Sequence, residues 1–173
     1  KGMLEINGDP HTSYMTETES NDLASSIDRD FEGIGVQYYA GDLNVVTRVF
    51  KNSPAEKAGV KAGDILHQVD GVKLEGKTSE EIQSLIMGES GTNVNVEFLR
   101  NQEIVKFDIK RGKINALAWG EVIEEGVGYV EISSFGSHLG DSLKAYLDEM
   151  IEQDVHKLII DLRDNGGGYL HAI

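Results

Sequence analysis

Apolar and polar positions in the last third of the chain follow two different periods. Apolar residues recur in steps of three and four between positions 139 and 151, which predicts an amphipathic helix from about Leu139 to Gln153. Short apolar runs of strand length stand on either side, at residues 126–132 and 158–162. The second run, interrupted only by Asp161, is typical of a strand buried on both faces of a parallel sheet. Strand, helix and strand in this order predict a βαβ unit with a right-handed crossover.

The middle of the chain has the pattern of a small β domain, with short apolar strands separated by glycine turns. Residues 94–98 alternate between apolar and polar side chains, and residues 104–109 return as the second strand of a hairpin. Two short helices interrupt the strands. The first, at residues 53–59, has a capping serine, a proline at its first position and a terminal glycine. The second, at residues 78–86, has a threonine or serine as its cap.

The N-terminal segment contains the signals for one further helix. Thr16 and Glu19 have the spacing of a capping box. Behind them, Leu23, Ile27 and Phe31 recur every four residues and would share one helix face. The segment is therefore predicted to form a helical arm.

Composition and charge exclude several functions. A net charge of −14 argues against nucleic acid and anionic membrane surfaces as partners. The chain has no cysteine, which excludes disulfides and thiol nucleophiles, and its five histidines lack the spacing of metal ligands. We therefore expect no metal and no cofactor. No apolar stretch approaches the roughly 18–20 residues of a membrane span, and no signal-peptide pattern opens the chain.

Two motifs in the middle region resemble those of PDZ domains. Residues 33–36 (Gly-Ile-Gly-Val) resemble the carboxylate-binding loop, and residues 53–64 (Ser-Pro-Ala-Glu-Lys-Ala-Gly-Val-Lys-Ala-Gly-Asp) resemble the segment that follows the next strands. The fold class is therefore mixed α+β in three parts. We expect an N-terminal arm at residues 1–30, a PDZ domain at residues 31–112 and the start of an α/β core at residues 113–173.

The PDZ resemblance implies a binding site for a polypeptide C-terminus. The N–H groups of Ile34, Gly35 and Val36 would bind the terminal carboxylate, and the peptide would extend antiparallel to the strand that follows. Its last side chain, expected to be apolar, would enter a pocket formed by Ile34 and Val36 together with Ile82 and Ile86. Core packing is the alternative for these last two residues, because one helix face must serve both purposes.

A glycine-rich loop follows the second strand of the βαβ unit, where residues 161–168 are Asp-Leu-Arg-Asp-Asn-Gly-Gly-Gly. A dinucleotide-binding loop would need a third glycine where His171 stands, and no lysine follows as in a phosphate-binding loop. Two alternatives are left: a plain turn, or a loop whose bare N–H groups stabilise a developing oxyanion.

This loop resembles that of the C-terminal processing peptidases (tail-specific proteases), which have Asp-Leu-Arg followed by Asn-Pro-Gly-Gly. Gly166 stands in place of the family's proline, so the loop should be looser here. Residues 9–15 (Asp-Pro-His-Thr-Ser-Tyr-Met) resemble the family's Asp-Pro-Tyr-Thr-x-Tyr-Met, with His11 in place of the first tyrosine. The order of these segments around a PDZ domain points to the same family.

The resemblance implies a serine-type peptidase. A serine would attack the scissile carbonyl, a lysine kept neutral by desolvation would take its proton, and backbone N–H groups would stabilise the oxyanion. Gly167 is the first candidate donor and Gly166 the second. The family's serine and lysine lie beyond the glycine loop, so we expect neither in this chain. The serines at residues 133–137 match no nucleophile position, and Lys144 lies on the polar face of its helix.

The parent protein is therefore expected to be an endopeptidase that recognises substrate C-termini, with polypeptides carrying a free apolar C-terminus as partners. The chain itself would bind such tails and be catalytically inert. A non-catalytic PDZ scaffold protein and a homologue that has lost its nucleophile are the alternatives. The resemblance also implies a location outside the cytoplasm. An open edge on the last strand predicts self-association, giving a homo-oligomer through the C-terminal region, or disorder there.

Overall fold

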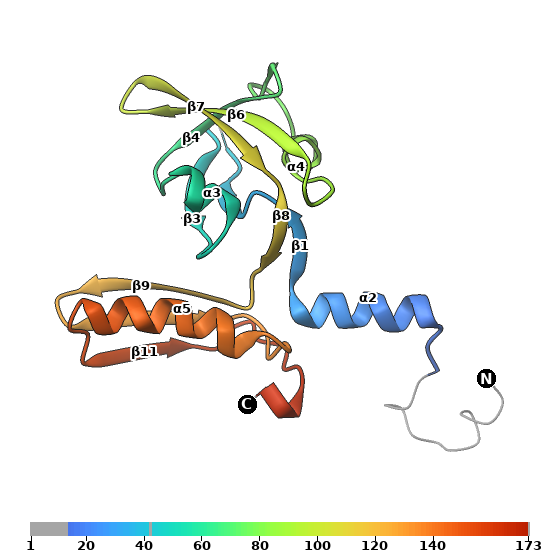
Figure 1. The fold of residues 1–173 in the computed structure, drawn as a ribbon, viewed down its shortest axis with the longest axis vertical. Coiled ribbons are helices and arrows are strands. Elements are labelled where there is room, and N and C mark those ends of the chain that lie inside the picture. The colour runs from blue at the N-terminus through green and yellow to red at the C-terminus, as the bar shows by residue number, and fades with distance from the viewer. Residues whose placement is uncertain (1–13, 42, 173) are drawn as a thin grey trace.

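The computed structural model describes residues 14–41 and 43–172, and these form two sheet-containing parts joined by a two-stranded ribbon (Figure 1). The segment at residues 9–15 that resembles the peptidase family lies, except for its last two residues, outside the described ranges. The elements, in chain order, are α2 (Glu17–Asp28), β1 (Asp30–Gly33), β2 (Val36–Tyr39), β3 (Val45–Val49), α3 (Pro54–Ala58), β4 (Ile65–Val69), β5 (Val72–Lys73), α4 (Ser79–Ile86), β6 (Asn93–Arg100), β7 (Glu103–Lys110), β8 (Gly112–Asn115), β9 (Ala118–Glu124), β10 (Val127–Ile132), α5 (Leu139–Glu152), β11 (Lys157–Asp161) and the 3-10 turn η1 (Leu170–Ala172).

The middle part is an antiparallel sheet with strand order β2-β3-β4-β6-β7, to which β5 adds beside β4. Strands β6 and β7 pair over their whole length, which confirms the predicted hairpin. The helices α3 and α4 begin at the predicted caps Ser53 and Thr78, whose side chains accept backbone N–H groups three residues on. The core is closely packed, and Phe98, Val96 and Val69 have no exposed surface. The fold is the predicted small β domain with two helices.

The last part is a three-stranded sheet of order β11-β10-β9 with α5 packed against it (Figure 1). Strands β10 and β11 run parallel and are joined through α5, which confirms the predicted βαβ unit. Strand β9, antiparallel to β10, was not predicted. Ala118, Gly120 and Val122 face α5, but the alternate positions also include the apolar residues Trp119 and Ile123, so the strand has no clear period of two.

The pattern of β11 is typical of a strand buried on both faces, but in the described residues this strand is largely exposed and has an open edge. Leu158, Ile159 and Ile160 are 42%, 47% and 56% exposed. The physical reason is that β11 pairs with one neighbour only and that α5 covers only one side of this sheet.

The arm helix α2 begins with the predicted capping box, in which Thr16 and Glu19 bond each other's backbone N–H groups. The predicted apolar face does not continue to Phe31, because the helix ends at Asp28 and Arg29 adopts a left-handed conformation. Figure 1 shows α2 extending away from both sheets, and none of its residues is buried. No helix among residues 14–41 and 43–172 is long and apolar enough to span a bilayer.

Candidate functional site

The loop between β1 and β2 presents two backbone N–H groups that have no partner among the described residues. The carbonyl of Ile34 accepts the N–H of Ala55 at 2.8 Å, and the carbonyl of Gly35 accepts that of Phe50 at 3.0 Å. These bonds turn both carbonyls toward the start of α3. The N–H groups of Ile34 and Gly35 donate to no other group in the described ranges, so they are available to an anion.

Gly35 is the residue that makes this loop geometry accessible. Its φ is +84°, a conformation that side chains rarely adopt, and a Cβ atom there would lie 2.4 Å from Cβ of Ser53. Ser53 is held in place because it caps α3, where its hydroxyl accepts the N–H of Glu56 at 3.1 Å. Any larger residue at position 35 would push the loop off the helix.

The loop opens into a groove of about 360 Å³ between strand β2 and helix α4. In the part of the chain that the structure describes, strand β2 is the edge of its sheet, because it pairs with β3 alone. An extended peptide can therefore add to its free edge through main-chain hydrogen bonds. No charged residue lines the groove within residues 14–41 and 43–172. Its lining consists of Phe31, Gly33, Ile34, Gly35, Val36, Gln37, Tyr38, Ser79, Gln83, Ile86 and Met87.

Four of the five residues predicted for tail binding line this groove: Ile34, Gly35, Val36 and Ile86. Ile82 does not. It is fully buried in the core of the β domain, which is the core-packing alternative stated for it. Ile86, one helical turn later on the same face, is also buried in this core and lines the groove as well.

Sequence reasoning missed Tyr38, Ser79, Gln83 and Met87 as lining residues. The period-two alternation of β2 places Tyr38 on the same side as Val36, so the sequence could have predicted Tyr38 as a lining residue. The helical period likewise relates Gln83 to Ser79 and Ile86, which are four and three residues away. Nothing in the local sequence indicated Met87, because it follows the end of α4.

The helix wall of the groove is fixed at both of its ends. At its start, Thr78 and Glu81 form a reciprocal capping box. At its end, the guanidinium of Arg111 donates to the carbonyls of Leu85 and Ile86, both at 2.9 Å. These carbonyls would otherwise lack partners, so Arg111 stabilises the last turn of α4.

The glycine loop after β11 is organised by Asn165. Its side-chain amide donates to the carbonyl of Ile132 at 2.8 Å, and its side-chain oxygen accepts the N–H of Gly167 at 2.8 Å. The carbonyl of Gly167 in turn accepts the N–H of Phe135 at 2.9 Å. The loop is therefore tied to the exit of β10 on two sides.

This arrangement bears on the two predicted oxyanion donors. The N–H of Gly167, the first candidate, is already engaged by Asn165. The N–H of Gly166 has no partner among the described residues, and the residue is exposed. In this arrangement the N–H of Gly166, and not that of Gly167, could bind an oxyanion. The oxyanion role of Gly166 stays a prediction.

A charged cluster stands just before the loop. The guanidinium of Arg163 bonds both carboxylate oxygens of Asp161, and the hydroxyl of Tyr129 donates to the same carboxylate at 2.5 Å. These hydrogen bonds, that from Arg163 first, hold the pKa of Asp161 well below its usual range. The bond to Asp161 also raises the pKa of Tyr129. Asp161 is thus a fixed anion that orients this strand end, not a proton acceptor at neutral pH.

The serines near the loop have partners that are not lysine or histidine. The hydroxyl of Ser133 donates to the carbonyl of Ala116 at 2.7 Å, and that of Ser134 donates to Gly167 at 3.2 Å. Lys144 forms an exposed ion pair with Asp148, one helical turn away. Among the described residues, these groups do not form a nucleophile and base pair.

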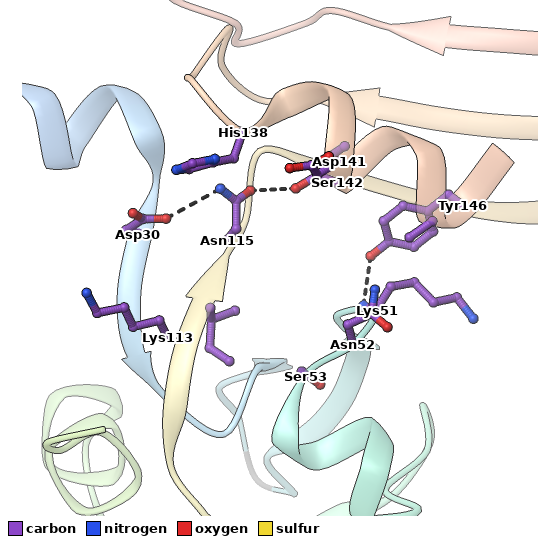
Figure 2. Close-up of a pocket in the computed structure, with 13 residues that line it drawn as sticks. Asp30, Lys51, Asn52, Ser53, Lys113, Asn115, His138, Asp141, Ser142 and Tyr146 are labelled. Atoms are coloured by element: carbon purple, nitrogen blue, oxygen red, sulfur yellow. Dashed lines mark hydrogen bonds between the residues drawn. The ribbon is translucent and has the colours of Figure 1, made fainter. Parts of the chain in front are cut away.

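A second cavity, of about 410 Å³, lies where the ribbon meets helix α5 (Figure 2). Asn115 bridges it, since its side-chain amide donates to Asp30 at 3.4 Å and its oxygen accepts the hydroxyl of Ser142 at 2.6 Å. His138 lines the same cavity, but the Ser142 hydroxyl is directed to Asn115. The polar groups here hold the two parts of the chain together.

These features define a class of protein: a PDZ domain followed by the opening of a peptidase core. The model of the PDZ domain matches residues 45–100, and the model of Peptidase family S41 matches residues 126–173. The chain is similar to the C-terminal processing peptidases, and it contains a PDZ domain and the start of a Peptidase family S41 core.

Individual relatives agree along the whole chain. It is 32% identical to "Carboxy-terminal processing protease CtpB" of Bacillus subtilis over all of its length, and 32% identical to "Probable CtpA-like serine protease" of Staphylococcus haemolyticus over 98%. It covers 38% and 34% of these relatives, or about a third of their length. The solved structure of a "Photosystem II D1 C-terminal processing protease" superposes with a TM-score of 0.52 at 25% identity, over 99% of this chain and 50% of that one.

Proposed function

We propose that the whole protein is a serine-type endopeptidase that recognises polypeptides by their C-termini through its PDZ groove. The feature that carries the proposal is the combination of two N–H groups, those of Ile34 and Gly35, with the edge of β2 beside them, none of which has a partner among the described residues. Only a chain end offers a carboxylate in line with an extended backbone, so this combination favours tails over internal segments.

The groove's neutral lining supports an apolar last residue. A carboxylate would be held by backbone N–H groups alone, with no lysine or arginine among the lining residues to attract other anions. Val36 and Ile86 would contact the last side chain. Burial of one aliphatic side chain in such a pocket contributes about 1.5–3 kcal/mol.

The 173 residues by themselves are proposed to bind tails without hydrolysing them. In the family the nucleophilic serine and its lysine follow the glycine loop, and the serines near the loop here donate to carbonyl groups. The same observation favours the second candidate, a peptide-binding module without catalysis. The two candidates differ in whether the whole protein hydrolyses polypeptides. Hydrolysis that is abolished by replacing a serine downstream of the glycine loop would support the peptidase and exclude the non-catalytic module.

Binding of a fluorescent peptide with an apolar free C-terminus, measured by anisotropy beside the same peptide amidated, tests the recognition step. We expect the acid to bind and the amide to bind at least tenfold more weakly, because the amide cannot accept hydrogen bonds as an anion. Equal binding of both peptides would contradict tail recognition.

A location outside the cytoplasm and self-association through β11 stay proposals. Fractionation of cells would test the location, and sedimentation of the chain would test the self-association.

A further inference from the structure

The groove is bridged at the end that lies away from the carboxylate-binding loop. Gly33 and Met87 are close to each other at one end, and Tyr38 and Ser79 at the other. The hydroxyl of Tyr38 donates to the carbonyl of Ser79 at 3.1 Å and lies 3.4 Å from its hydroxyl. A hydrogen-bonded side chain thus joins the strand wall of the groove to its helix wall.

The bridge lies at a definable position along a bound tail. Residues rise about 3.3 Å each along a strand, and alternate side chains point to opposite faces. A peptide added antiparallel to β2 would have its last side chain beside Val36 and its third-last side chain beside Tyr38. The residue between them would point away, toward the exposed side of Gln37.

Tyr38 has little freedom to make room. Its ring is half-buried and packs against the core of the β domain, and its hydroxyl is held by the backbone of the first turn of α4. The neighbouring Tyr39, by contrast, is 71% exposed. A large side chain beside Tyr38 would have to break the hydrogen bond and displace the ring.

Resting on the proposed tail-binding function, we propose that the Tyr38–Ser79 bridge restricts the third residue from the end of the tail to a small side chain. Glycine, alanine and serine would fit beneath the bridge, while leucine, phenylalanine and tryptophan would not. The second-last residue would be unrestricted. The preferred ligand class is therefore a tail with an apolar last residue and a small third-last residue.

The experiment compares labelled free-acid peptides that end in valine and differ only at the third-last residue. Wild type should bind the alanine and serine peptides about tenfold or more tightly than the leucine and phenylalanine peptides, as for other pockets that reject added methylene groups. The same substitutions at the second-last residue should change affinity less than threefold. An amidated peptide of each sequence measures the carboxylate requirement separately.

Three variants assign the preference to Tyr38. Tyr38→Ala should bind small and large peptides with similar affinity, and Tyr38→Phe should discriminate less than wild type because its ring is no longer held by Ser79. Tyr39→Ala, which changes the exposed neighbour, should discriminate as wild type does. Thermal unfolding verifies that each variant is folded. If Tyr38→Ala does not fold, the loss of discrimination in Tyr38→Phe tests the role of the bridge instead.

The outcomes separate this inference from the proposed function. Free-acid peptides that bind without preference at the third-last residue, or with a preference that persists in Tyr38→Ala, would overturn the role of the bridge and leave tail recognition standing. If no free-acid peptide binds, tail recognition fails and the role of the bridge fails with it.

Discussion

Arg48 of strand β3 donates to the carboxylate of Glu131 on strand β10 at 2.8 Å, and this bond connects the β domain to the peptidase part. The same guanidinium lies 4.3 Å from the ring centre of Trp119, on β9. Arg48 stands opposite Gln37 of β2, the strand that forms one wall of the groove. This contact between the two parts of the chain therefore lies one strand away from the groove.

Arg48→Ala should weaken this contact. Both side chains of the pair are about a quarter exposed, so the ion pair contributes about 0.5–1 kcal/mol, and stacking on Trp119 contributes a similar amount. We expect a loss of about 1–2 kcal/mol in the free energy of unfolding, measured by urea denaturation, together with faster proteolysis between residues 110 and 118.

Lys144→Ala is the matched control, since it also removes a cation from an ion pair. Its partner Asp148 is on the same helix and both are exposed, so the loss should stay below about 0.5 kcal/mol. A loss for Arg48→Ala as small as that of the control would show that the contact to the second sheet contributes little.

Asp64→Asn, within the β domain, should lower the free energy of unfolding more than Arg48→Ala does. Asp64 is 1% exposed, and the guanidinium of Arg100 bonds both of its oxygens at 2.7 Å. The substitution leaves the partly buried guanidinium of Arg100, 27% exposed, without its counter-charge, so we expect a loss of about 2–4 kcal/mol in unfolding free energy at pH 7. Asp108→Asn, at an exposed position on β7, should change it by less than about 0.5 kcal/mol.

The cost of Asp64→Asn should depend on pH. Burial acts to raise the pKa of Asp64, but the hydrogen bonds from Arg100 and from the N–H of Lys61 outweigh it, and the pKa lies below its usual value. Because the folded state holds fewer protons than the unfolded state, this stabilisation is complete above the usual pKa of about 3.9 and is lost as the pH falls toward the lower folded value. The difference between wild type and Asp64→Asn should therefore be constant above about pH 5 and shrink below pH 4 in urea titrations. A difference that grows on acidification would contradict this assignment.

The sequence predicted most of the elements because their signals are local. The caps Thr16, Ser53 and Thr78 each stand where a helix begins, and the steps of three and four place α5 within one residue of its observed end. Gly35 was predicted to belong to a carboxylate-binding loop, a role that stays a prediction, and its left-handed φ explains why a glycine stands there.

What the sequence could not predict depends on contacts between distant segments. Ile82 and Ile86 look equivalent on a helical wheel and both lie in the core, yet only Ile86 also lines the groove, which depends on how the whole domain packs. The bond from Asn165 to Gly167 occupies the N–H group that the motif alone nominates as an oxyanion donor. How far β11 is covered could not be read from its pattern, because periodicity shows which residues are apolar and not which neighbours cover them.

Gly35→Ala should disrupt tail binding more than overall stability. The left-handed φ costs about 1–2 kcal/mol for a residue with a side chain, and contact with Ser53 would also move the loop. We expect anisotropy to detect at least a tenfold weaker affinity for the free-acid peptide. Gly71→Ala has a similar φ, +80°, but open space around it and a position outside the groove. That variant should lose stability by about 1 kcal/mol and keep its affinity; equal effects on binding would show that strain, and not the loop, is responsible.

Asn165→Ala should release the N–H of Gly167. In wild type this N–H donates to the Asn165 side chain at 2.8 Å, and loss of one such hydrogen bond, worth about 1 kcal/mol, should accelerate exchange of the amide hydrogen about fivefold. The amide of Gly166 should exchange quickly in both proteins. Ser134→Ala is the matched control, because its hydroxyl contacts the carbonyl of Gly167 and leaves the N–H bonded, so exchange should not change. Fast exchange of Gly167 already in wild type, measured by NMR, would mean that Asn165 does not hold this amide in solution, and Gly167 would then be as accessible to an oxyanion as Gly166.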